Sequence, residues 1–418
     1  MARCWATGQL LTELCEDLAP EFEVTVIAGQ PNHNPDQGDF VRHGWQQRRG
    51  VAIRRVRHTR FSKTGLLGRA VNMLSYLTAA ALAGLTLRRQ AMIVVETDPP
   101  LLCLLGALLR LRHRARLVVY LQDIYPDVAV ALQKLRPGVF TWLLRRLFFA
   151  IYRSADRVVV LSRDMRALLI AGGVAAERIV CIPNWVDTRS VYPRKVDNPL
   201  RAEQALDDRF VVMYSGNMGL SQRLEVVLDA AAELQDVPEI VLLMIGDGAS
   251  RARLEALARE QRLSNVRFLP YRPKSELAAS LSAADLHLVM LDPALTQLLM
   301  PSKIYGVLAA GVASLVIADP GSELAEMTQL HATGLVVPPG DAAALASAVR
   351  WAAAHGDELA AMGLRARKLA ETQYDRRRAT AAFAEVLEKL KKPASQAENT
   401  PLEPETYSPR PRPWANRL

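Results

Sequence analysis

The chain has 418 residues, of which 50% are apolar and 23% charged, and its formal net charge is +9 at pH 7. This apolar content excludes fibrous and disordered classes for most of the length, and the length favours two domains over one. The basic balance indicates an anionic partner, which the charge alone leaves open between nucleic acid, a membrane surface and phosphorylated substrates.

Positive charge is concentrated in one early stretch, because Phe40 to Val95 contains no Asp or Glu. The stretch has little aromatic interleaving and no nucleic-acid-binding motif, so we expect an anionic membrane surface, and no nucleic acid, as its partner. The cations of this Arg42–Arg89 region are Arg42, Arg48, Arg49, Arg54, Arg55, Arg57, Arg60, Lys63, Arg69, Arg88 and Arg89.

No apolar run reaches the roughly 18 residues of a membrane-spanning helix. Leu101 to Leu111 is predicted to be a buried helix, whereas Leu66 to Leu87, flanked by arginines, fits interfacial attachment and burial equally well. Met1 to Asp17 lacks the hydrophobic segment of a signal peptide. The four cysteines are scattered without metal-ligand spacing, as in a reduced compartment. We therefore expect a cytoplasmic protein that is peripheral on the inner face of the plasma membrane.

A helix is predicted before the first visible strand. Apolar residues recur at helical spacing from Leu10 to Leu18, and Glu23 to Gly29 follows as a short β-branched strand. In an alternating α/β protein, a glycine loop such as Ala6-Thr7-Gly8 follows an opening strand, which Met1 to Trp5 is too short to supply. We therefore expect the first strand to be missing ahead of this loop.

The alternation of strands and helices then continues. Each predicted strand is a mainly apolar, β-branched run of about five residues, which is typical of strands covered on both faces in a parallel sheet. Polar, turn-rich segments follow these strands, where ligand groups lie in such sheets. The strands are predicted at Val51–Val56, Ala91–Val95, Arg116–Leu121, Arg157–Leu161 and Arg178–Ile182.

A polar stretch after Asp187, ending at Asp208, is predicted to be an interdomain linker before a second α/β series. The second series has strands at Phe210–Tyr214, Ile240–Ile245, Val266–Leu269, Leu286–Leu291 and Ser314–Ile317. Its helices are predicted at Arg223–Leu234, Ser250–Gln261, Lys274–Ala284, Ala343–Ala354, Glu358–Thr372 and Arg376–Leu390. From Lys391 onward, Pro, Glu, Ser and Thr predominate, which predicts disorder.

The stretch Met300 to Gly311 places a Pro-Ser-Lys turn directly before an alanine-rich apolar run. A hydroxyl and an ammonium at a helix start suit an anion, because the free N–H groups and the helix dipole favour negative charge. Ordinary helix capping accounts for Pro and Ser equally well. Two α/β series imply two facing domains, and the cleft between them is then the expected site.

Five segments carry a resemblance to a known family: Ile182–Asp187, Tyr214–Gly219, Ile245–Gly248, Met300–Gly311 and Thr333–Asp341. In this order they resemble family 4 glycosyltransferases of the GT-B fold, especially bacterial O-antigen and capsule enzymes of the L-fucosamine-transferase type. The resemblance covers about Ala6 to Leu390. It implies two facing Rossmann-like domains with parallel sheets, divided into an N-terminal domain (1–188), a C-terminal domain (189–374), a helix crossing back to the N-terminal domain (375–391) and a disordered tail (392–418).

The resemblance also implies an activity, which is retaining transfer of a hexosyl or acetamidosugar unit from a nucleotide-sugar. The donor would be a UDP-sugar held mainly by the C-terminal domain, and the acceptor a lipid-linked or polysaccharide glycan of cell-surface polysaccharide biosynthesis. No metal or other cofactor is implied, and the sequence contains no Asp-x-Asp pair. The alternative is a catalytically inactive GT-B module that binds a membrane or a biosynthetic partner. An epimerase or dehydrogenase would need a Gly-x-Gly-x-x-Gly fingerprint after an early strand, and the sequence has none.

A departing nucleoside diphosphate leaves charge on its β-phosphate, so a catalyst needs fixed hydrogen-bond donors there. The donor-binding residues that match the family's motifs are Gly216, Asn217, Gly219, Gly246, Gly248, Pro270, Tyr271, Ser302 and Glu323, with Lys303 as the catalytic cation. Plainer explanations exist for each: a strand-to-helix turn for the glycines, a solvated lysine at a helix start, a strand end with a half-buried tyrosine, and helix capping by Glu323.

On the acceptor side, Asp123 is the catalytic candidate that would orient an acceptor hydroxyl, and an Asx-type turn cap explains it equally well. Asp98 and Asp127 also follow predicted strands and are assigned to this side, together with Gly8. Ser162 is predicted to cap the following helix. The sequence departs from the family where two glutamates are common, since Leu298 and Gly306 occupy those positions.

Overall fold

The computed structural model describes residues 6–29, 43–61, 66–219 and 222–391. The expected strand ahead of the first glycine loop, the basic residues Arg42 and Lys63, and the tail from 392 to 418 lie outside these residues. Among the described residues, no helix combines the length and apolarity needed to cross a bilayer.

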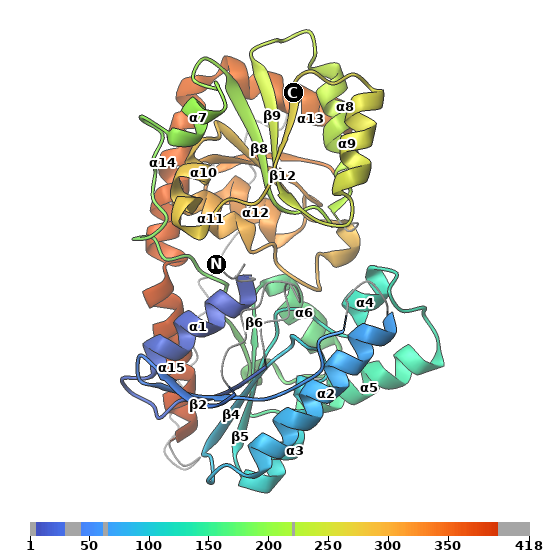
Figure 1. Ribbon diagram of the computed structural model, residues 1–418, viewed down its shortest axis with the longest axis vertical. Helices are drawn as coiled ribbons and strands as arrows, with labels where there is room; N and C mark the ends of the chain where they lie inside the picture. The colour runs from blue at the N-terminus through green and yellow to red at the C-terminus, as the bar shows by residue number, and fades with distance from the viewer. Residues whose placement is uncertain (1–5, 30–42, 62–65, 220–221, 392–418) are drawn as a thin grey trace.

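The chain folds into two α/β domains stacked along the long axis of the molecule (Figure 1). The predicted two-domain architecture with parallel sheets is therefore confirmed. Its physical basis is visible in the strands themselves, because β11 and β12 are buried at every position and so need helices on both faces.

The N-terminal domain contains two sheets among its described residues. A four-stranded parallel sheet has the order β4-β5-β6-β7, and a three-stranded sheet has the order β1-β3-β2, in which β2 runs antiparallel to β3. The strands are β1 (Thr25–Ala28), β2 (Gly44–Arg48), β3 (Val51–Arg55), β4 (Met92–Glu96), β5 (Arg116–Tyr120), β6 (Arg157–Val160) and β7 (Ile179–Cys181).

Helices α2, α3 and α5 lie together on one side of this domain, and α1 and α15 lie on the other (Figure 1). From α15, Phe383 packs edge-to-face on Tyr120 of β5, with ring centroids 5.3 Å apart, so the last helix covers the N-terminal sheet. The helices are α1 (Ala6–Leu18), α2 (Leu66–Leu85), α3 (Leu102–His113), α4 (Asp127–Ala131), α5 (Val139–Ser154), α6 (Arg163–Ala171) and α15 (Arg376–Lys391).

The C-terminal domain is built on a six-stranded parallel sheet in the order β10-β9-β8-β11-β12-β13. Its strands are β8 (Phe210–Asn217), β9 (Ile240–Asp247), β10 (Val266–Leu269), β11 (Leu286–Met290), β12 (Ala313–Ile317) and β13 (Gly334–Val337). Its helices are α7 (Pro199–Glu203), α8 (Glu225–Glu233), α9 (Arg251–Glu260), α10 (Leu277–Ser282), α11 (Lys303–Ala309), α12 (Glu323–Leu330), α13 (Ala342–Ala354) and α14 (Gly356–Gln373).

The stretch predicted as a polar linker is only partly a linker. Asn198 caps α7, and the buried guanidinium of Arg201 donates to the carbonyl oxygens of Ala283, Leu206 and Arg209. These bonds fix residues 198–209 to the C-terminal domain. The prediction was wrong here because a polar composition fits two kinds of segment equally well. One is a solvated linker, and the other is a packed segment whose buried arginine donates to backbone carbonyls.

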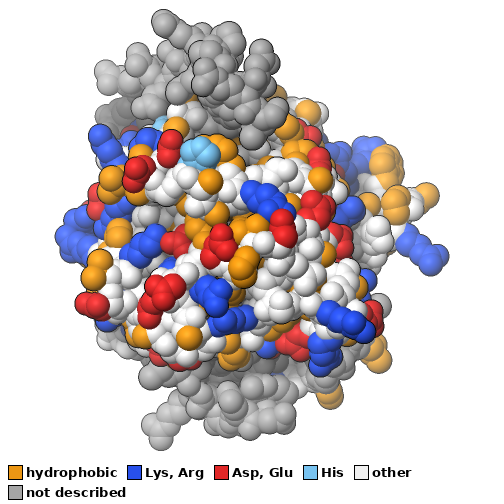
Figure 2. Space-filling view, turned by 90° about the horizontal axis from the view of Figure 1, so that it is seen from above, with side chains coloured by type: hydrophobic (Ala, Val, Ile, Leu, Met, Phe, Trp, Pro, Cys, Tyr) orange, Lys and Arg blue, Asp and Glu red, His pale blue; other side chains and the backbone are white. Residues whose placement is uncertain are grey.

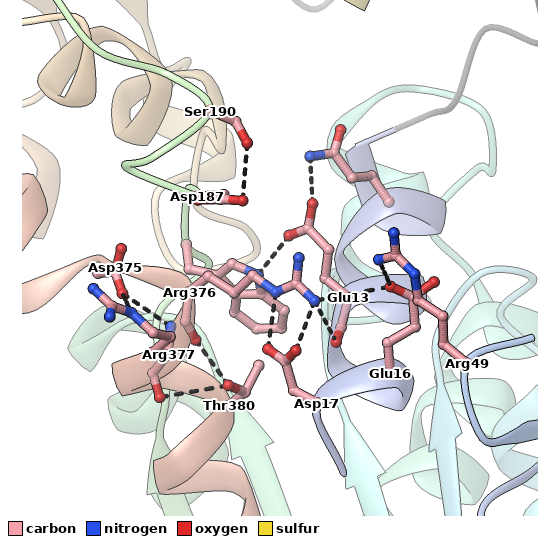
Figure 3. Close-up of polar contacts among 12 residues, drawn as sticks. Glu13, Glu16, Asp17, Arg49, Asp187, Ser190, Asp375, Arg376, Arg377 and Thr380 are labelled. Carbon is pink, nitrogen blue, oxygen red and sulfur yellow. Dashed lines mark hydrogen bonds and ion pairs between the residues drawn. The ribbon is translucent and has the colours of Figure 1, made fainter. Parts of the chain in front are cut away.

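The two chain crossings between the domains are joined to each other. Val186 donates its N–H to the carbonyl of Tyr374, and Arg376 donates its N–H to the carbonyl of Val186, each at 3.0 Å. The Arg376 side chain then forms a bidentate ion pair with Asp17 of α1 at 2.8 and 2.6 Å (Figure 3). This junction anchors the start of α15 to the N-terminal domain.

Candidate functional site

A buried lysine marks the C-terminal domain's side of the cleft. Lys303 is the first residue of α11, and its Nζ lies 3.9 Å from the centre of the Tyr214 ring. The Nζ atom is shielded from solvent and has no hydrogen-bond partner among the residues that the structure describes. Burial lowers the pKa of Lys303 from 10.5 to about 7, because desolvation penalises the charged form. The described part of the chain thus places no counter-ion beside this buried amine.

Glycines place backbone directly against this ammonium. A Cβ atom added at Gly216 would lie only 3.3 Å from the Lys303 Nζ, so the strand end of β8 passes beside it. Gly216, Gly246 and Gly248 all have positive φ, at 145°, 151° and 154°. A Cβ at Gly246 would lie 1.9 Å from the Gly216 carbonyl oxygen. Only glycine permits this close approach between the ends of β8 and β9, and the predicted contact with a nucleotide stays a prediction.

The remaining donor-side candidates lie around the same strand ends. Tyr214 donates its hydroxyl to the carbonyl of Asn217 at 2.7 Å, which ties the ring beneath Lys303 to the loop that leads to Gly219. Pro270 and Tyr271 follow β10 and are exposed. Ser302 immediately precedes α11 and makes no capping bond with its side chain, so the plain capping explanation is not borne out for its hydroxyl.

Glu323 contacts the opposite domain in this structure. Its carboxylate accepts from the backbone N–H of Arg163 at the start of α6, and Asp164 of α6 accepts from the Glu323 N–H at 2.8 Å. Arg163 also pairs with Glu326 at 2.7 Å. Each helix therefore caps the other across the cleft, an arrangement we call the reciprocal cap. Capping by Glu323 is present, but it acts on α6, while Ser322 caps α12 itself.

Three carboxyl groups of the N-terminal domain lie close enough together to interact electrostatically. Glu96 ends β4, Asp98 follows it, and Asp123 follows β5, and we call these three residues the carboxyl cluster. Burial, followed by the charge of Asp98, raises the pKa of Asp123 to about 6. The pKa of Glu96 is raised further by burial, Asp98 and Asp123. Burial and neighbouring carboxylates both disfavour the charged form, so the pKa values of Glu96 and Asp123 lie above those of solvated carboxyls.

The carboxyl cluster is joined to the segment that leads to Lys303. Asp123 forms a β-bridge with Leu299, and Ile124 donates its N–H to the carbonyl of Leu298 at 3.0 Å. Since Leu299 is four residues before Lys303, their Cα atoms are at most about 14 Å apart. One short segment of the C-terminal domain therefore connects the carboxyl cluster to Lys303.

Gly8 is not brought into this arrangement, and Asp127 lines a separate pocket between the domains. Gly8 is exposed in the first turn of α1, with open space around it. Asp127 begins α4 and pairs with Arg145 of α5 at 2.8 Å. Ser162 caps α6 by accepting from the Met165 N–H at 3.1 Å, as predicted.

The positions that carry acids in many family members are closed here. Leu298 is buried, and a side chain at Gly306 would meet the Leu281 Cδ1 atom at 3.2 Å. A side chain at Gly306 would therefore require the Leu281 side chain to shift by a few tenths of an ångström.

Sequence reasoning assigned no role to Tyr214, Glu96 or Thr97. Glu96 and Thr97 lie in the polar segment that follows a predicted strand, and Tyr214 begins one of the motif segments. In the structure, the Thr97 hydroxyl accepts from the N–H groups of Gln122 and Asp123 at 3.1 and 3.3 Å, and so links the ends of β4 and β5. Glu96 could have been found, because it stands at a predicted strand end.

Comparison with protein-family models gives two matches that follow each other along the chain. Residues 7–190 match Glycosyltransferase Family 4, and residues 197–369 match Glycosyl transferases group 1. The break between the two matches falls at the chain crossing that joins the domains. The chain therefore belongs to the family 4 glycosyltransferases with the GT-B architecture.

Curated relatives agree with this assignment. The chain is 30% identical over 267 residues to WcaI of Escherichia coli K12, named as a colanic acid biosynthesis glycosyl transferase, and 32% identical over 261 residues to the glycosyltransferase WbjE of Pseudomonas aeruginosa. Each match covers 62% of this chain, and the chain spans only 65% of the length of each of these relatives.

Solved structures show the same fold. Sucrose-phosphate synthase from Thermosynechococcus elongatus superposes with a TM-score of 0.72 at 20% identity, covering 92% of this chain and 93% of that one. HepE from Anabaena, solved with UDP and glucose, superposes with a TM-score of 0.70 at 16% identity, covering 93% and 97%.

Proposed function

We propose that the protein is a retaining glycosyltransferase that moves a sugar from a UDP-sugar to a lipid-linked or polysaccharide acceptor in cell-surface polysaccharide biosynthesis, such as that of O-antigen. The observation that carries the proposal is the unpartnered Lys303 ammonium held against the glycine turn at Gly216. A buried cation with a depressed pKa is costly unless an anion completes its site. A donor diphosphate supplies that anion.

The proposed reaction uses this cation on the leaving group. The bond between the sugar C1 and the β-phosphate oxygen breaks, and C1 bonds to the acceptor oxygen on the same face. The acceptor's proton passes to a phosphate oxygen of the departing UDP. Lys303 stabilises the charge that develops on that phosphate, and the backbone N–H groups near Gly216 add fixed donors. Asp123 orients the acceptor hydroxyl.

The choice of a uridine nucleotide rests on similarity. HepE was solved with UDP, and another structure of this fold, described as trehalose-6-phosphate from E. coli, was solved with UDP-2-fluoro glucose bound. In this chain the Arg251 guanidinium donates to the Gly246 carbonyl at 2.6 Å, which steadies the turn beside exposed Pro270 and Tyr271. We assign the base to this region.

The assignment to a lipid-linked glycan at the inner face of the plasma membrane rests on two supports. The name of WcaI places that relative in colanic acid biosynthesis. The Arg42–Arg89 region supplies positive charge, although part of it is used internally: Arg48 and Arg49 pair with Glu16, and Arg54 and Arg55 donate to backbone carbonyls.

We further propose that transfer needs no metal. Among the described residues, no group of three or more His, Cys, Asp or Glu side chains is placed to hold an ion. The positive charge that a metal provides at a diphosphate would come from Lys303 and the start of α11. Transfer that persists at full rate in excess EDTA is the expected result, and a requirement for added Mg²⁺ or Mn²⁺ would contradict it.

The experiment is incubation with a panel of UDP-sugars and polyprenyl-diphosphate-linked acceptors, followed by NMR of the anomeric carbon in the product. We expect one donor to be consumed with retained configuration. Inversion would refute the retaining mechanism. UDP binding without transfer to any acceptor would favour the inactive GT-B module. That alternative is tested because Leu298 and Gly306 stand where glutamates are common in the family.

A further inference from the structure

The first half of α5 is apolar but is not buried. Its exposed side chains include Val139 at 75%, Phe140 at 68%, and Trp142 and Leu143 at 54% each. The second half of the same helix packs into the core through Phe148, Phe149, Ile151 and Tyr152. The helix is therefore anchored at one end and presents an apolar tip at the other. We call residues 134–147 the α5 tip.

Within the α5 tip itself every charged side chain is positive, and one of them, Arg145, is paired with Asp127 of α4 at 2.8 Å. Between Asp127 and Asp156 there is no Asp or Glu, whereas Lys134, Arg136, Arg145, Arg146 and Arg153 lie there. Lys134, Arg136 and Arg146 are exposed, and the Arg146 guanidinium lies 4.9 Å from the Trp142 ring centre. An exposed tryptophan among aliphatic side chains with a cationic border is the composition that proteins use at a bilayer interface.

The α5 tip projects from the body of the protein. Seen along the long axis, hydrophobic and Lys or Arg side chains extend past the C-terminal domain on the side where Figure 1 places α4 and α5 (Figure 2). A projecting convex tip can enter a lipid surface without colliding with the rest of the protein. We propose that the α5 tip is the membrane-docking surface, with Phe140 and Trp142 inserted among lipid chains and the flanking cations on anionic headgroups.

This docking would bring the interdomain cleft to the lipid surface. A pocket of about 830 Å³ opens beside the tip, where Trp142 and Arg145 face Thr296, Gln297 and Leu298 of the C-terminal domain. Leu298 belongs to the segment that bridges Asp123 and leads to Lys303. A lipid-linked acceptor held in the bilayer therefore has a short path to the proposed site. The inference deepens the proposed function by naming the surface that delivers its acceptor.

The test is co-sedimentation of the whole chain with vesicles of phosphatidylcholine and phosphatidylglycerol at low salt, without donor or acceptor. We expect the pair Phe140→Ser and Trp142→Ser to weaken binding about tenfold or more, because two interfacial aromatic side chains are lost. Leu364→Ser on α14 is the matched control, since Leu364 is 74% exposed in the other domain. Unchanged thermal melting of both variants would show that they are folded.

Two results would overturn the proposal. If Leu74→Ser with Leu82→Ser on α2 abolishes binding and the α5 pair does not, the membrane surface belongs to the Arg42–Arg89 region. If sedimentation velocity without lipid shows a dimer that only the α5 pair dissociates, and vesicle binding is unchanged, the tip is a contact between copies of this chain. Because no transfer is measured, failure here is distinguishable from failure of the proposed activity.

Discussion

The two domains each hold one buried group of titratable side chains, Lys303 in the C-terminal domain and the carboxyl cluster in the N-terminal domain. On the C-terminal domain, a single ammonium lies against glycine backbone, with no counter-ion in the part of the chain that the structure describes. On the N-terminal domain, three carboxyl groups crowd together, and the Glu96 Oε1 atom is buried without a partner. The ammonium does not pair with the carboxyls, although one short segment connects the two groups.

This difference indicates what each group is built to receive. The burial of both groups is unfavourable in the free protein, and such groups mark functional sites more often than structural ones. An anion completes the Lys303 side. A hydroxyl-rich neutral molecule suits the carboxyl cluster, because partly protonated carboxyls both donate and accept hydrogen bonds. Under the proposed function, we therefore assign the diphosphate to the Lys303 side and the sugar acceptor to the carboxyl cluster.

The largest effect is expected from removing the cation. Lys303→Ala should lower kcat for sugar transfer by about 10²- to 10³-fold, as expected when a fixed charge at the leaving group is lost. Lys368→Ala, at an exposed lysine of α14, is the matched control and should keep full activity. Initial rates at saturating donor measure both. If Lys303→Ala transferred sugar as fast as Lys368→Ala, Lys303 would have no role in catalysis.

Removing one carboxyl should lower the rate less than removing Lys303 does. It should also raise the stability of the folded protein at alkaline pH. Asp123→Asn should lower kcat by about 10²-fold if Asp123 orients the hydroxyl. Because the folded pKa of about 6 exceeds the ordinary value of 3.8, the ionised carboxylate destabilises the folded protein above pH 6, and this penalty disappears as pH falls towards 3.8. The variant should therefore be more stable than wild type at pH 8, by about 1–3 kcal/mol.

Rate against pH and urea unfolding at pH 8 check this prediction together. The wild-type rate should fall as pH drops below about 6, as the pKa of Asp123 implies, and the variant should lack that limb. Lost activity with lost stability would instead indicate that Asp123 is a turn cap.

The glycine turn offers a test through stability. Gly246→Ala should destabilise the fold by about 3 kcal/mol or more, since its Cβ would overlap the Gly216 carbonyl and its φ is positive. Gly356→Ala at the start of α14, where an added Cβ meets nothing within 4 Å, is the control and should be neutral or stabilising. Thermal melting compares them. Equal melting temperatures would contradict the described close approach.

The smallest effect is expected at the reciprocal cap. Asp164→Ala removes the carboxylate that accepts from the Glu323 N–H and should cost about 1 kcal/mol, as for other helix caps. Asp357→Ala, at an exposed aspartate in the first turn of α14, serves as the control. Urea titration resolves the two. A loss no larger than that of the control would mean that the capping bond contributes nothing to domain apposition.

The sequence predicted the parts of this protein that are local along the chain. Strands with continuous β-branched runs were found within one to three residues, as was the glycine turn, because both depend on neighbouring residues. Strand β2, with the polar sequence Gly-Trp-Gln-Gln-Arg, lies at a sheet edge and lacks that signal, and β13 was seen only as part of a motif.

Features that depend on distant partners could not be predicted. The Arg163–Glu323 contact joins residues 160 positions apart, and no pattern in the sequence around either residue predicts it. The α5 tip has the pattern of a core helix, and only the packed structure shows that Phe140 and Trp142 lie outside the core. Lys303 was predicted as a site residue, but its burial over Tyr214 was not.

The most direct test of the proposed role of Lys303 is calorimetric titration of UDP into wild type and Lys303→Met in two buffers of different ionisation enthalpy at pH 8. Because the free pKa of Lys303 is about 7 and a bound diphosphate raises it, wild-type binding should take up a proton, and affinity should fall by up to about tenfold per pH unit above 7. Lys303→Met should bind weakly with no proton uptake. Equal affinity and equal proton uptake in the two proteins would contradict the account.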